Sequence, residues 1–327
     1  MKHIVNGNLW KRLFAKIIDF LMVFGLSFLL FFTLIYPNTF DETKYTSNLD
    51  KIGEEYDRSQ LFLKSSKGNY TSKGAFRAIV KIDDLISIDL SLDGEEFKDV
   101  NLTESLVYFY CDVYNTFGNE KNLSFDVFKN QVFKIGTSES NIKDFKIENG
   151  NYTYVLEDTS KDAEYKTVLF VLDCYLEAAN SVTYSPEVSR LNEENNALML
   201  NTLSLLIPVI VGFSLIFDLI IPLFNEGGQS IGKMIFKLEI ITKDGYVLNK
   251  WRLIVRWISY LILDLLLGFV TFFGAFLISY TMMVFNKRGM VIHDYISGTR
   301  VVDKETTIRF RNAEEERKFN ERVGVIQ

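Results

Sequence analysis

Twenty consecutive residues, from Ile17 to Tyr36, constrain this chain more than any other feature, because all of them except Asp19 are apolar or uncharged. At about 1.5 Å of rise per residue, a helix of this length spans roughly 30 Å, the thickness of the hydrocarbon core of a bilayer. The residues before the run are basic: Lys11, Arg12 and Lys16. Because basic residues stay on the cytoplasmic side, the run predicts a membrane-spanning helix with a cytoplasmic N-terminus. The alternative, a cleaved signal peptide, normally has a shorter apolar run and a small-residue cleavage site, which does not follow Tyr36.

The charge of the chain is unevenly distributed. Residues 37–196 contain 17 Lys and Arg against 29 Asp and Glu, a net charge of −12, which leaves +6 for the other residues. The basic residues elsewhere lie beside apolar runs, as expected for membrane topology rather than for a basic binding surface. Since no dense basic patch with interleaved aromatic residues occurs, we do not expect nucleic-acid binding.

Residues 37–196 are polar and long enough to form a domain, which lies outside the cytoplasm if the first helix is oriented as expected. Asn149-Gly150 separates two alternating runs between Phe145 and Glu157, a pattern typical of a β-hairpin. Ser124 and Ser160 precede helical patterns and could cap them. Three further elements are expected: helices at Glu104–Tyr114 and at Lys161–Asn180, and a strand at Phe76–Ile82. The pattern predicts an α+β domain.

Both cysteines, Cys111 and Cys174, fall in this outer domain. An oxidising location allows a disulfide, but cysteine is also a small residue that is commonly buried as a free thiol. The sequence gives no distance between the two, so both alternatives stay open. A cysteine nucleophile is disfavoured, because the two histidines, His3 and His293, are expected on the other side of the membrane.

Two further apolar stretches follow. Residues 197–224 predict a second span that carries Asp218. Residues 253–285 form a run of 33 residues, and one straight helix of that length would measure about 50 Å, too long for a single crossing. A hairpin of two spans turning near Gly268 fits better and returns Arg300 to the cytoplasm. Between the two stretches, Leu238–Thr242 and Tyr246–Leu248 flank Lys243-Asp244-Gly245 and predict a short cytoplasmic hairpin.

The predicted fold is therefore an α-helical multi-pass membrane protein with about four transmembrane helices and an α+β extracytoplasmic insertion domain. Its expected parts are a cytoplasmic N-terminus with the first span (1–36), the outer domain (37–196), the second span (197–224), a cytoplasmic loop with a hairpin (225–252), a helical hairpin in the membrane (253–285), and a cytoplasmic motif with a charged tail (286–327). For the tail, a solvated helix or disorder is expected.

The sequence contains few motifs that would indicate an enzyme. Gly227–Lys233 reads GGQSIGK, which is close to a phosphate-binding loop, but Met234 occupies the position of the Ser or Thr that would hold magnesium. The loop also follows an apolar helix rather than a strand. Because no Ser/His/Asp set, Cys/His metal cluster or dinucleotide fingerprint is visible, we expect neither catalysis nor a cofactor.

Ionisable residues inside the apolar runs carry the functional information, because each costs about 3 kcal/mol at the bilayer centre and usually faces protein or water. Asp19 shares a helix face with Arg12 and Lys16, so an interfacial salt bridge is the alternative to an ion-binding role. Arg252, Arg256, Tyr260 and Asp264 recur every four residues along one ridge. The ridge could line a water-filled path or form interhelical hydrogen bonds. The candidate ion or proton site comprises Asp19, Asp218, Arg256 and Asp264.

Several motifs occur in order: RLFAKIIDF at 12–20, QSIGK at 229–233, and His-Asp followed by Ser-Gly-Thr at 293–299. They resemble those of the RDD family of bacterial membrane proteins, named for one arginine and two aspartates. The resemblance covers about residues 9–36 and 197–303, but not the long insertion between the first two spans. It assigns family positions to Arg12, Asp19, Gln229, Gly232, Lys233, His293, Asp294, Gly298 and Thr299, and it implies a strand at Thr299–Asp303 beside the cytoplasmic hairpin. The molecular role implied by the family is unsettled, with transport the usual suggestion.

Two functions therefore remain open. The first is movement of a small ion or solute across a bacterial plasma membrane by intramembrane carboxylates. The second is a non-transporting anchor or sensor whose acidic outer domain binds an envelope ligand or partner. In either case we expect the lipid bilayer as surroundings, both termini in the cytoplasm, and self-association or a membrane partner, because a few spans cannot easily enclose a wide path.

Overall fold

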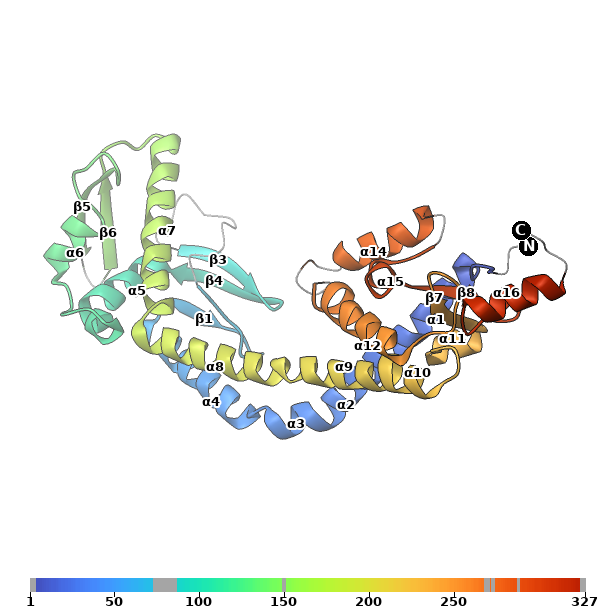
Figure 1. Ribbon diagram of the computed structural model, residues 1–327. Coiled ribbons are helices and arrows are strands. Elements are labelled where there is room, and N and C mark those ends of the chain that lie inside the picture. The colour runs from blue at the N-terminus through green and yellow to red at the C-terminus, as the bar shows by residue number, and fades with distance from the viewer. Residues whose placement is uncertain are drawn as a thin grey trace. The chain divides into compact units, whose positions relative to one another are not determined.

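The computed structural model describes residues 4–72, 87–148, 151–267, 271, 274–286 and 289–323. The chain separates into two compact units, each of which is described by itself below. Unit 1 comprises Met1–Phe40 and Asn201–Gln327, and unit 2 comprises Asp41–Leu200. Figure 1 shows that the described elements are mostly helical, with strands only in short pairs.

Two long apolar helices contribute to unit 1. The first, Leu9–Thr39, joins α1 (Leu9–Phe20), η1 (Leu21–Gly25), α2 (Leu26–Leu30), η2 (Phe31–Ile35) and α3 (Tyr36–Thr39). The second, Pro186–Phe224, joins α8 (Pro186–Ser204), α9 (Leu206–Ser214), η5 (Leu215–Ile220) and α10 (Ile221–Phe224). Within the described residues, these two are long and apolar enough to cross a bilayer. They include the two stretches for which the sequence predicts spans, 17–36 and 197–224.

The third apolar stretch contains α12 (Lys250–Ser259), η6 (Tyr260–Leu266) and α14 (Gly274–Phe285). α14 packs against η6, and α12 packs against α15 (Ile292–Ser297). The turn expected near Gly268 lies outside the described residues. The stretch is therefore folded back on itself between two helical segments.

The cytoplasmic hairpin predicted around Lys243-Asp244-Gly245 is wrong. The strand β7 (Leu238–Thr242) pairs antiparallel with β8 (Thr299–Asp303), with Leu238 opposite Asp303 and Thr242 opposite Thr299. All five residues of β7 are buried, and four of the five residues of β8 are buried with them, whereas Val247 of the predicted hairpin is exposed. The strand implied at Thr299–Asp303 is thus present, as the direct partner of β7.

The remaining helices of unit 1 are short. α11 (Ile231–Ile235) packs against α1 and leads into β7. α16 (Ala313–Arg322) is capped by Asn312 and has no buried residue. Of the two alternatives expected for the charged tail, a solvated helix or disorder, these residues therefore form the solvated helix.

Unit 2 combines helices with three antiparallel strand pairs. Its helices are α4 (Glu42–Ser59), α5 (Leu102–Tyr108), η3 (Phe109–Val113), η4 (Tyr114–Phe117), α6 (Phe125–Gln131), α7 (Lys161–Thr183) and most of α8, up to Leu200. Its strands are β1 (Phe62–Lys64) with β2 (Tyr70–Ser72), β3 (Ser87–Leu92) with β4 (Glu95–Asn101), and β5 (Ile142–Glu148) with β6 (Asn151–Leu156). The predicted hairpin is β5–β6, although its turn, Asn149-Gly150, and the strand expected at Phe76–Ile82 lie outside the described residues.

The helix caps of unit 2 follow the sequence pattern. Ser124 Oγ accepts a hydrogen bond from the Val127 amide, and Ser160 Oγ accepts one from the Ala163 amide. α7 begins at Lys161 as expected and runs three residues beyond Asn180. The helix expected at Glu104–Tyr114 corresponds to α5 and η3.

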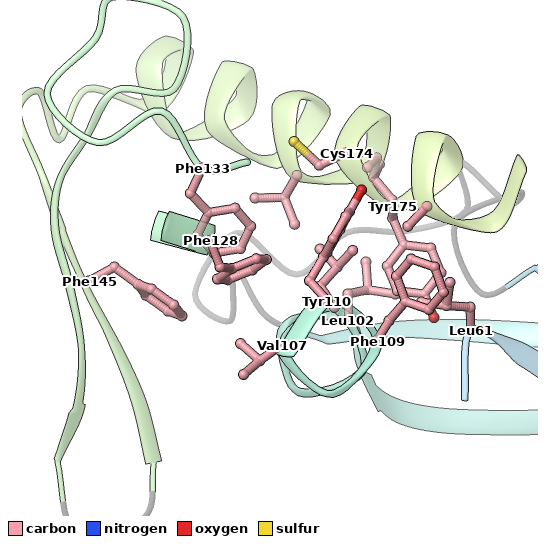
Figure 2. Packing of buried hydrophobic residues seen from close by; sticks show 14 of the residues in the cluster. Leu61, Leu102, Val107, Phe109, Tyr110, Phe128, Phe133, Phe145, Cys174 and Tyr175 are labelled. Carbon is pink, nitrogen blue, oxygen red and sulfur yellow. The ribbon is translucent and has the colours of Figure 1, made fainter. Parts of the chain in front are cut away.

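The core of unit 2 is aromatic. Phe109, Phe128, Phe133 and Phe145 are fully buried and gather against one face of α7, where Tyr175 lies among them (Figure 2). Both cysteines contribute to this packing as free thiols. Of the two alternatives for Cys111 and Cys174, the structure therefore contains free thiols, buried at Cys174 and partly buried at Cys111, rather than a disulfide.

Candidate functional site

The carboxylate of Asp19 on α1 is bound by the segment that begins α11. The amide of Gly232 donates to Asp19 Oδ1 at 2.7 Å, and Ser230 Oγ donates to Asp19 Oδ2 at 2.6 Å. Lys233 Nζ lies 3.4 Å from the same Oδ2 and donates to Ser230 Oγ at 2.6 Å. The salt bridge of Asp19 is therefore made with Lys233 of another helix, where the sequence suggested Arg12 or Lys16.

This arrangement explains the resemblance of GGQSIGK to a phosphate-binding loop. A loop of this kind presents a backbone amide, a hydroxyl and a lysine to an anion. Here the anion is the carboxylate of Asp19. Gly232 is required because a Cβ at that position would lie 2.0 Å from the carbonyl oxygen of Ala15. The loop therefore holds α11 against α1 by binding the carboxylate of Asp19.

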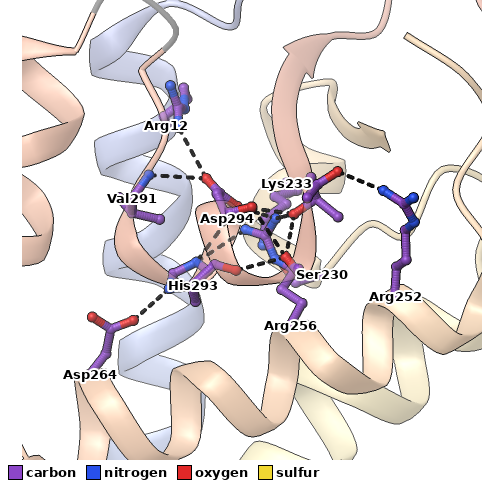
Figure 3. A network of polar contacts seen from close by, with 12 residues as sticks. Arg12, Ser230, Lys233, Arg252, Arg256, Asp264, Val291, His293 and Asp294 are labelled. Carbon is purple, nitrogen blue, oxygen red and sulfur yellow. Dashed lines mark hydrogen bonds and ion pairs between the residues drawn. The ribbon is translucent and has the colours of Figure 1, made fainter. Parts of the chain in front are cut away.

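Asp294 at the start of α15 forms a second centre and is fully buried. Its carboxylate pairs with the guanidinium of Arg256, and Arg12 Nη2 lies 3.9 Å away (Figure 3). The amide of Val291 donates to Asp294 Oδ2 at 3.3 Å, and Thr299 Oγ1 donates to Oδ1 at 3.4 Å. The residues to which the resemblance assigns the arginine and the second aspartate, Arg12 and Asp294, thus lie close together.

The C-terminal end of α15 is in contact with Arg252 of α12. Gly298 adopts a left-handed conformation with φ of 63°, which closes the short helix. Its carbonyl oxygen accepts a hydrogen bond from Arg252 Nη1 at 3.0 Å. A Cβ at this glycine would lie 2.9 Å from the same guanidinium nitrogen. The glycine is therefore favoured by its positive φ, whereas the flexible end of the Arg252 side chain could move to make room for a Cβ.

His293 connects this centre to the third apolar stretch. Its Nδ1 lies 2.5 Å from Asp264 Oδ2, and its Nε2 lies 3.2 Å from Arg256 Nη2. Arginine can only donate, so Nε2 must accept, and the ring proton must then reside on Nδ1 and point at the carboxylate. The contacts define a neutral imidazole between a carboxylate and a guanidinium.

The ridge on α12 and η6 therefore faces the motif residues. Arg256 Nη1 also donates to Thr299 Oγ1 at 2.9 Å, and the ammonium of Lys16 lies 3.6 Å from the ring centroid of Tyr260. Interhelical hydrogen bonds are thus present along the ridge, and Arg256 and Tyr260 also line a cavity.

Asp218 lies in η5 and lines the same cavity as Arg256 and Tyr260. Ser214 Oγ donates to Asp218 Oδ2 at 3.2 Å and itself accepts from Trp257 Nε1 at 3.2 Å. Both Asp218 in η5 and Asp264 in η6 lie in π-helical segments, which are rare and occur often at functional sites.

The cavity between these elements has a volume of about 70 Å³. Four basic side chains, three carboxylates and one histidine line it: Arg12, Lys16, Lys233, Arg256, Asp19, Asp218, Asp294 and His293. Asp264 is reached from it through His293. The volume accommodates a few water molecules or a small ion, far less than the several hundred Å³ of a site for an organic ligand. No group of three metal-ligating side chains occurs among the described residues.

Burial and charge set the protonation of the groups outside the apolar helices. Burial opposes ionisation of Asp294, but Arg256 and Arg12 outweigh it and hold the pKa of Asp294 below its usual range. Burial lowers the pKa of His293, and the hydrogen bond to Asp264 opposes that shift. Burial likewise lowers the pKa of Lys233, against the attraction of Asp19. The site is a charged network around one neutral imidazole.

The structure brings the predicted candidates Asp19, Asp218, Arg256 and Asp264 into one cluster with the motif residues Arg12, Lys233, His293, Asp294 and Thr299. Gln229 is separate, since its side chain donates to the Leu238 carbonyl oxygen at 2.6 Å and supports the loop. Sequence reasoning missed the roles of Ser230 and Trp257. The position of Ser230 between the glycines of GGQSIGK could have indicated that its hydroxyl binds an anion. Nothing in the sequence indicated that Trp257 donates a hydrogen bond to Ser214.

The comparisons with known proteins give one match. Residues 167–298 match the model of the RDD family. That segment includes the QSIGK and His-Asp motifs but begins inside unit 2, and it does not include the N-terminal motif with Arg12 and Asp19. No curated protein and no solved structure matches the chain. Residues 167–298 are therefore similar to the RDD family, and this match together with the two long apolar helices is consistent with a membrane protein of that family.

Proposed function

We propose that this protein moves a small ion across a bacterial plasma membrane, with both termini in the cytoplasm, and that the ion is a proton. The observation that supports it is the position of His293, hydrogen-bonded to Asp264 of the apolar stretch on one side and to Arg256 on the other. Histidine is the side chain whose unperturbed pKa lies near physiological pH, so it can accept and release a proton there.

The partners of the carboxylates favour a proton over a metal cation. Asp19 is bound by Lys233 and two further donors, and Asp294 is bound by Arg256 and Arg12. A metal cation would have to displace these positive groups from buried carboxylates, which is costly. The small cavity is a further argument against an organic solute.

The geometry gives the proton step a specific form. A proton that enters the cavity binds Nε2 of His293, which must first lose its hydrogen bond from Arg256. Arg256 keeps its contacts with Asp294 and Thr299, so the guanidinium stays in place while the imidazole becomes cationic. Transfer of the Nδ1 proton to Asp264 then leaves a neutral ring that carries its proton on Nε2, and a protonated Asp264. Loss of the proton from Asp264 and a flip of the imidazole restore the starting state, so one proton is bound and one is released in each cycle.

Purified protein in sealed vesicles tests this proposal. With a potassium diffusion potential imposed and a pH-sensitive dye inside, wild-type vesicles should acidify or alkalinise faster than protein-free vesicles. His293→Gln, which keeps hydrogen-bonding capacity but cannot become cationic, should abolish the difference. His3→Gln, at the other histidine in the sequence, is the matched control. An unchanged rate in His293→Gln contradicts the proposal.

A second candidate function rests on unit 2. This unit has its own aromatic core, and residues 37–196, which include all but its last four residues, carry a large excess of acidic residues. Such a domain could bind an envelope ligand or partner while the apolar helices anchor it. Residues 41–200, expressed alone and exposed to solubilised envelope fractions, test this function. A folded unit that retains no envelope component contradicts it.

A further inference from the structure

The distribution of side chains around α1 is inverted relative to a helix on the surface of a water-soluble protein. Trp10, Phe14, Ile17 and Leu21 are exposed, with 63% of the surface of Trp10 and 60% of that of Leu21 accessible. These positions follow the spacing i, i+4, i+7 and i+11, so they form one face of the helix. The buried residues of α1 are polar or small: Arg12, Ala15 and Asp19.

α12 and η6 repeat the same inversion. Trp251, Ile258, Ile262 and Leu266 are exposed, with 65% of the surface of Trp251 accessible, and they also share one face. Tyr260 and Asp264 are buried, and Arg256 is nearly so. On both helices, one face thus carries exposed apolar side chains, whereas Arg12, Asp19, Arg256 and Asp264 are turned into the network.

Exposure of such faces to water is unfavourable, since each large apolar side chain left exposed forgoes about 1.5–3 kcal/mol. In a bilayer the balance reverses. Acyl chains solvate the apolar face at no cost, and the charges have no alternative but to pair inside the protein. The inversion therefore identifies acyl chains as the occupant of both faces.

The two helices also begin alike. Asn8 accepts a hydrogen bond from the amide of Trp10 at 2.9 Å, and Asn249 accepts one from the amide of Trp251 at 3.2 Å. Each polar cap is thus followed two residues later by an exposed tryptophan. Tryptophan is enriched where the hydrocarbon meets the headgroups, and an exposed polar cap suits the same boundary.

α11 extends this surface. The ring of Phe14 stacks on Phe236, with centroids 6.2 Å apart, and Met234 and Ile235 are exposed beside it. Lys233 of the same short helix points the other way, toward Asp19. α11 therefore has a charged side on the network and an apolar side continuous with the outer face of α1.

We propose that the faces of α1, α11 and α12 defined by these residues are a lipid-contact surface, with Trp10 and Trp251 marking the boundary of one leaflet. At 1.5 Å per residue, Asp19 then lies about 14 Å and Asp264 about 20 Å along the helices from this boundary. The charged cavity therefore extends from this boundary, where Arg12 lines it, into the hydrocarbon layer. This surface does not depend on whether protons move, so it extends beyond the proposed function.

Quenching of tryptophan fluorescence by brominated lipids tests the surface, because the chain has three tryptophans. Full-length variants that retain only Trp10, only Trp251 or only Trp257, with Phe at the other two positions, would be reconstituted in phosphatidylcholine vesicles brominated either high or low on the acyl chain. Trp10 and Trp251 should be quenched strongly, and more by the shallow bromines. Trp257, which donates to Ser214 at the cavity, is the internal control and should be quenched several-fold less.

A displaced tryptophan makes the test sharper. Phe14→Trp, in a chain with Phe at positions 10, 251 and 257, moves the indole about 6 Å deeper along the same face, so its quenching should shift toward the deep bromines. Two results would overturn the proposal. If acrylamide but not bromine quenches Trp10 and Trp251, the two helix faces lie in water. If neither reagent quenches these tryptophans, protein covers the faces, for example a second copy of this chain.

Discussion

The amide of Gly232 donates a hydrogen bond to the carboxylate of Asp19, 2.7 Å away, across a contact so close that Gly232 has no room for a Cβ. This single relationship connects the N-terminal motif to the loop motif more than two hundred residues later. Through it, the carboxylate neutralises Lys233 and orients the segment that leads into β7. The motifs therefore act as parts of one packed network.

Gly232→Ala should destabilise the protein by about 1–3 kcal/mol, because the added methyl group would collide with the Ala15 carbonyl and force α11 away from α1. Thermal unfolding of the detergent-solubilised protein measures the effect. Gly212→Ala is the matched control, since a Cβ at that helical position meets nothing within 4 Å. Equal melting temperatures for the two variants would refute the close contact.

Asp19→Asn should be more costly, at about 3–5 kcal/mol, because it leaves the buried Lys233 without its counter-charge. The double variant Asp19→Asn with Lys233→Met should lose less stability than the sum of the two single variants. Lys237→Met, which removes a solvent-exposed partner of Glu305, serves as the control and should change little. Strict additivity of the two buried substitutions would show that the pair is not coupled.

Acidification should destabilise the wild type through His293. Burial lowers the pKa of His293 in the folded state, so the unfolded chain binds more protons once the pH falls below the unperturbed value of about 6.5. Stability contributed by the neutral ring is thus complete above that pH and is lost as the pH decreases toward the folded pKa. His293→Gln should flatten the dependence of melting temperature on pH between about 7 and 5. A slope identical to that of the wild type would disagree with this assignment.

The two thiols of unit 2 should react slowly. Burial raises the pKa of Cys111 to about 11 and that of Cys174 to about 12, so the reactive thiolate is scarce near neutral pH. A maleimide reagent should label neither thiol rapidly in the native protein and both after unfolding. Reductant should leave the electrophoretic mobility of the unfolded chain unchanged, and a mobility shift would instead show a disulfide between them.

Local signals in the sequence predicted much of the fold. Ser124 and Ser160 cap helices as expected, because capping depends only on neighbouring residues. The two long apolar helices were recognisable from length and composition. The wrong hairpin at Lys243-Asp244-Gly245 shows the limit: a turn signal was read correctly as a turn, but the partner of β7 is chosen by burial against a strand that lies far away in the sequence.

The candidate site was predicted in its residue types but not in its pairings. Periodicity placed Arg256 and Asp264 on one ridge, and that ridge does face the other charged residues. The sequence could not show that Asp19 pairs with Lys233, or that His293 joins Asp264 to Arg256, since these pairings depend on the packing of α11 and α15 against other helices. The sequence of α1 also could not show which face is exposed. Its pattern of apolar and charged residues is equally compatible with a helix on the surface of a water-soluble protein, whose charged face would be exposed instead.

The most direct test of the account is proton flux in vesicles containing Asp264→Asn. This substitution keeps the size of the side chain and a hydrogen-bonding partner for His293 but removes the charge that would receive the proton from Nδ1. Under an imposed membrane potential, the account predicts that wild-type vesicles change their internal pH well above the protein-free rate and that Asp264→Asn vesicles do not. Equal rates in the two, or no flux in the wild type, would contradict the claim that the charged cavity conducts protons.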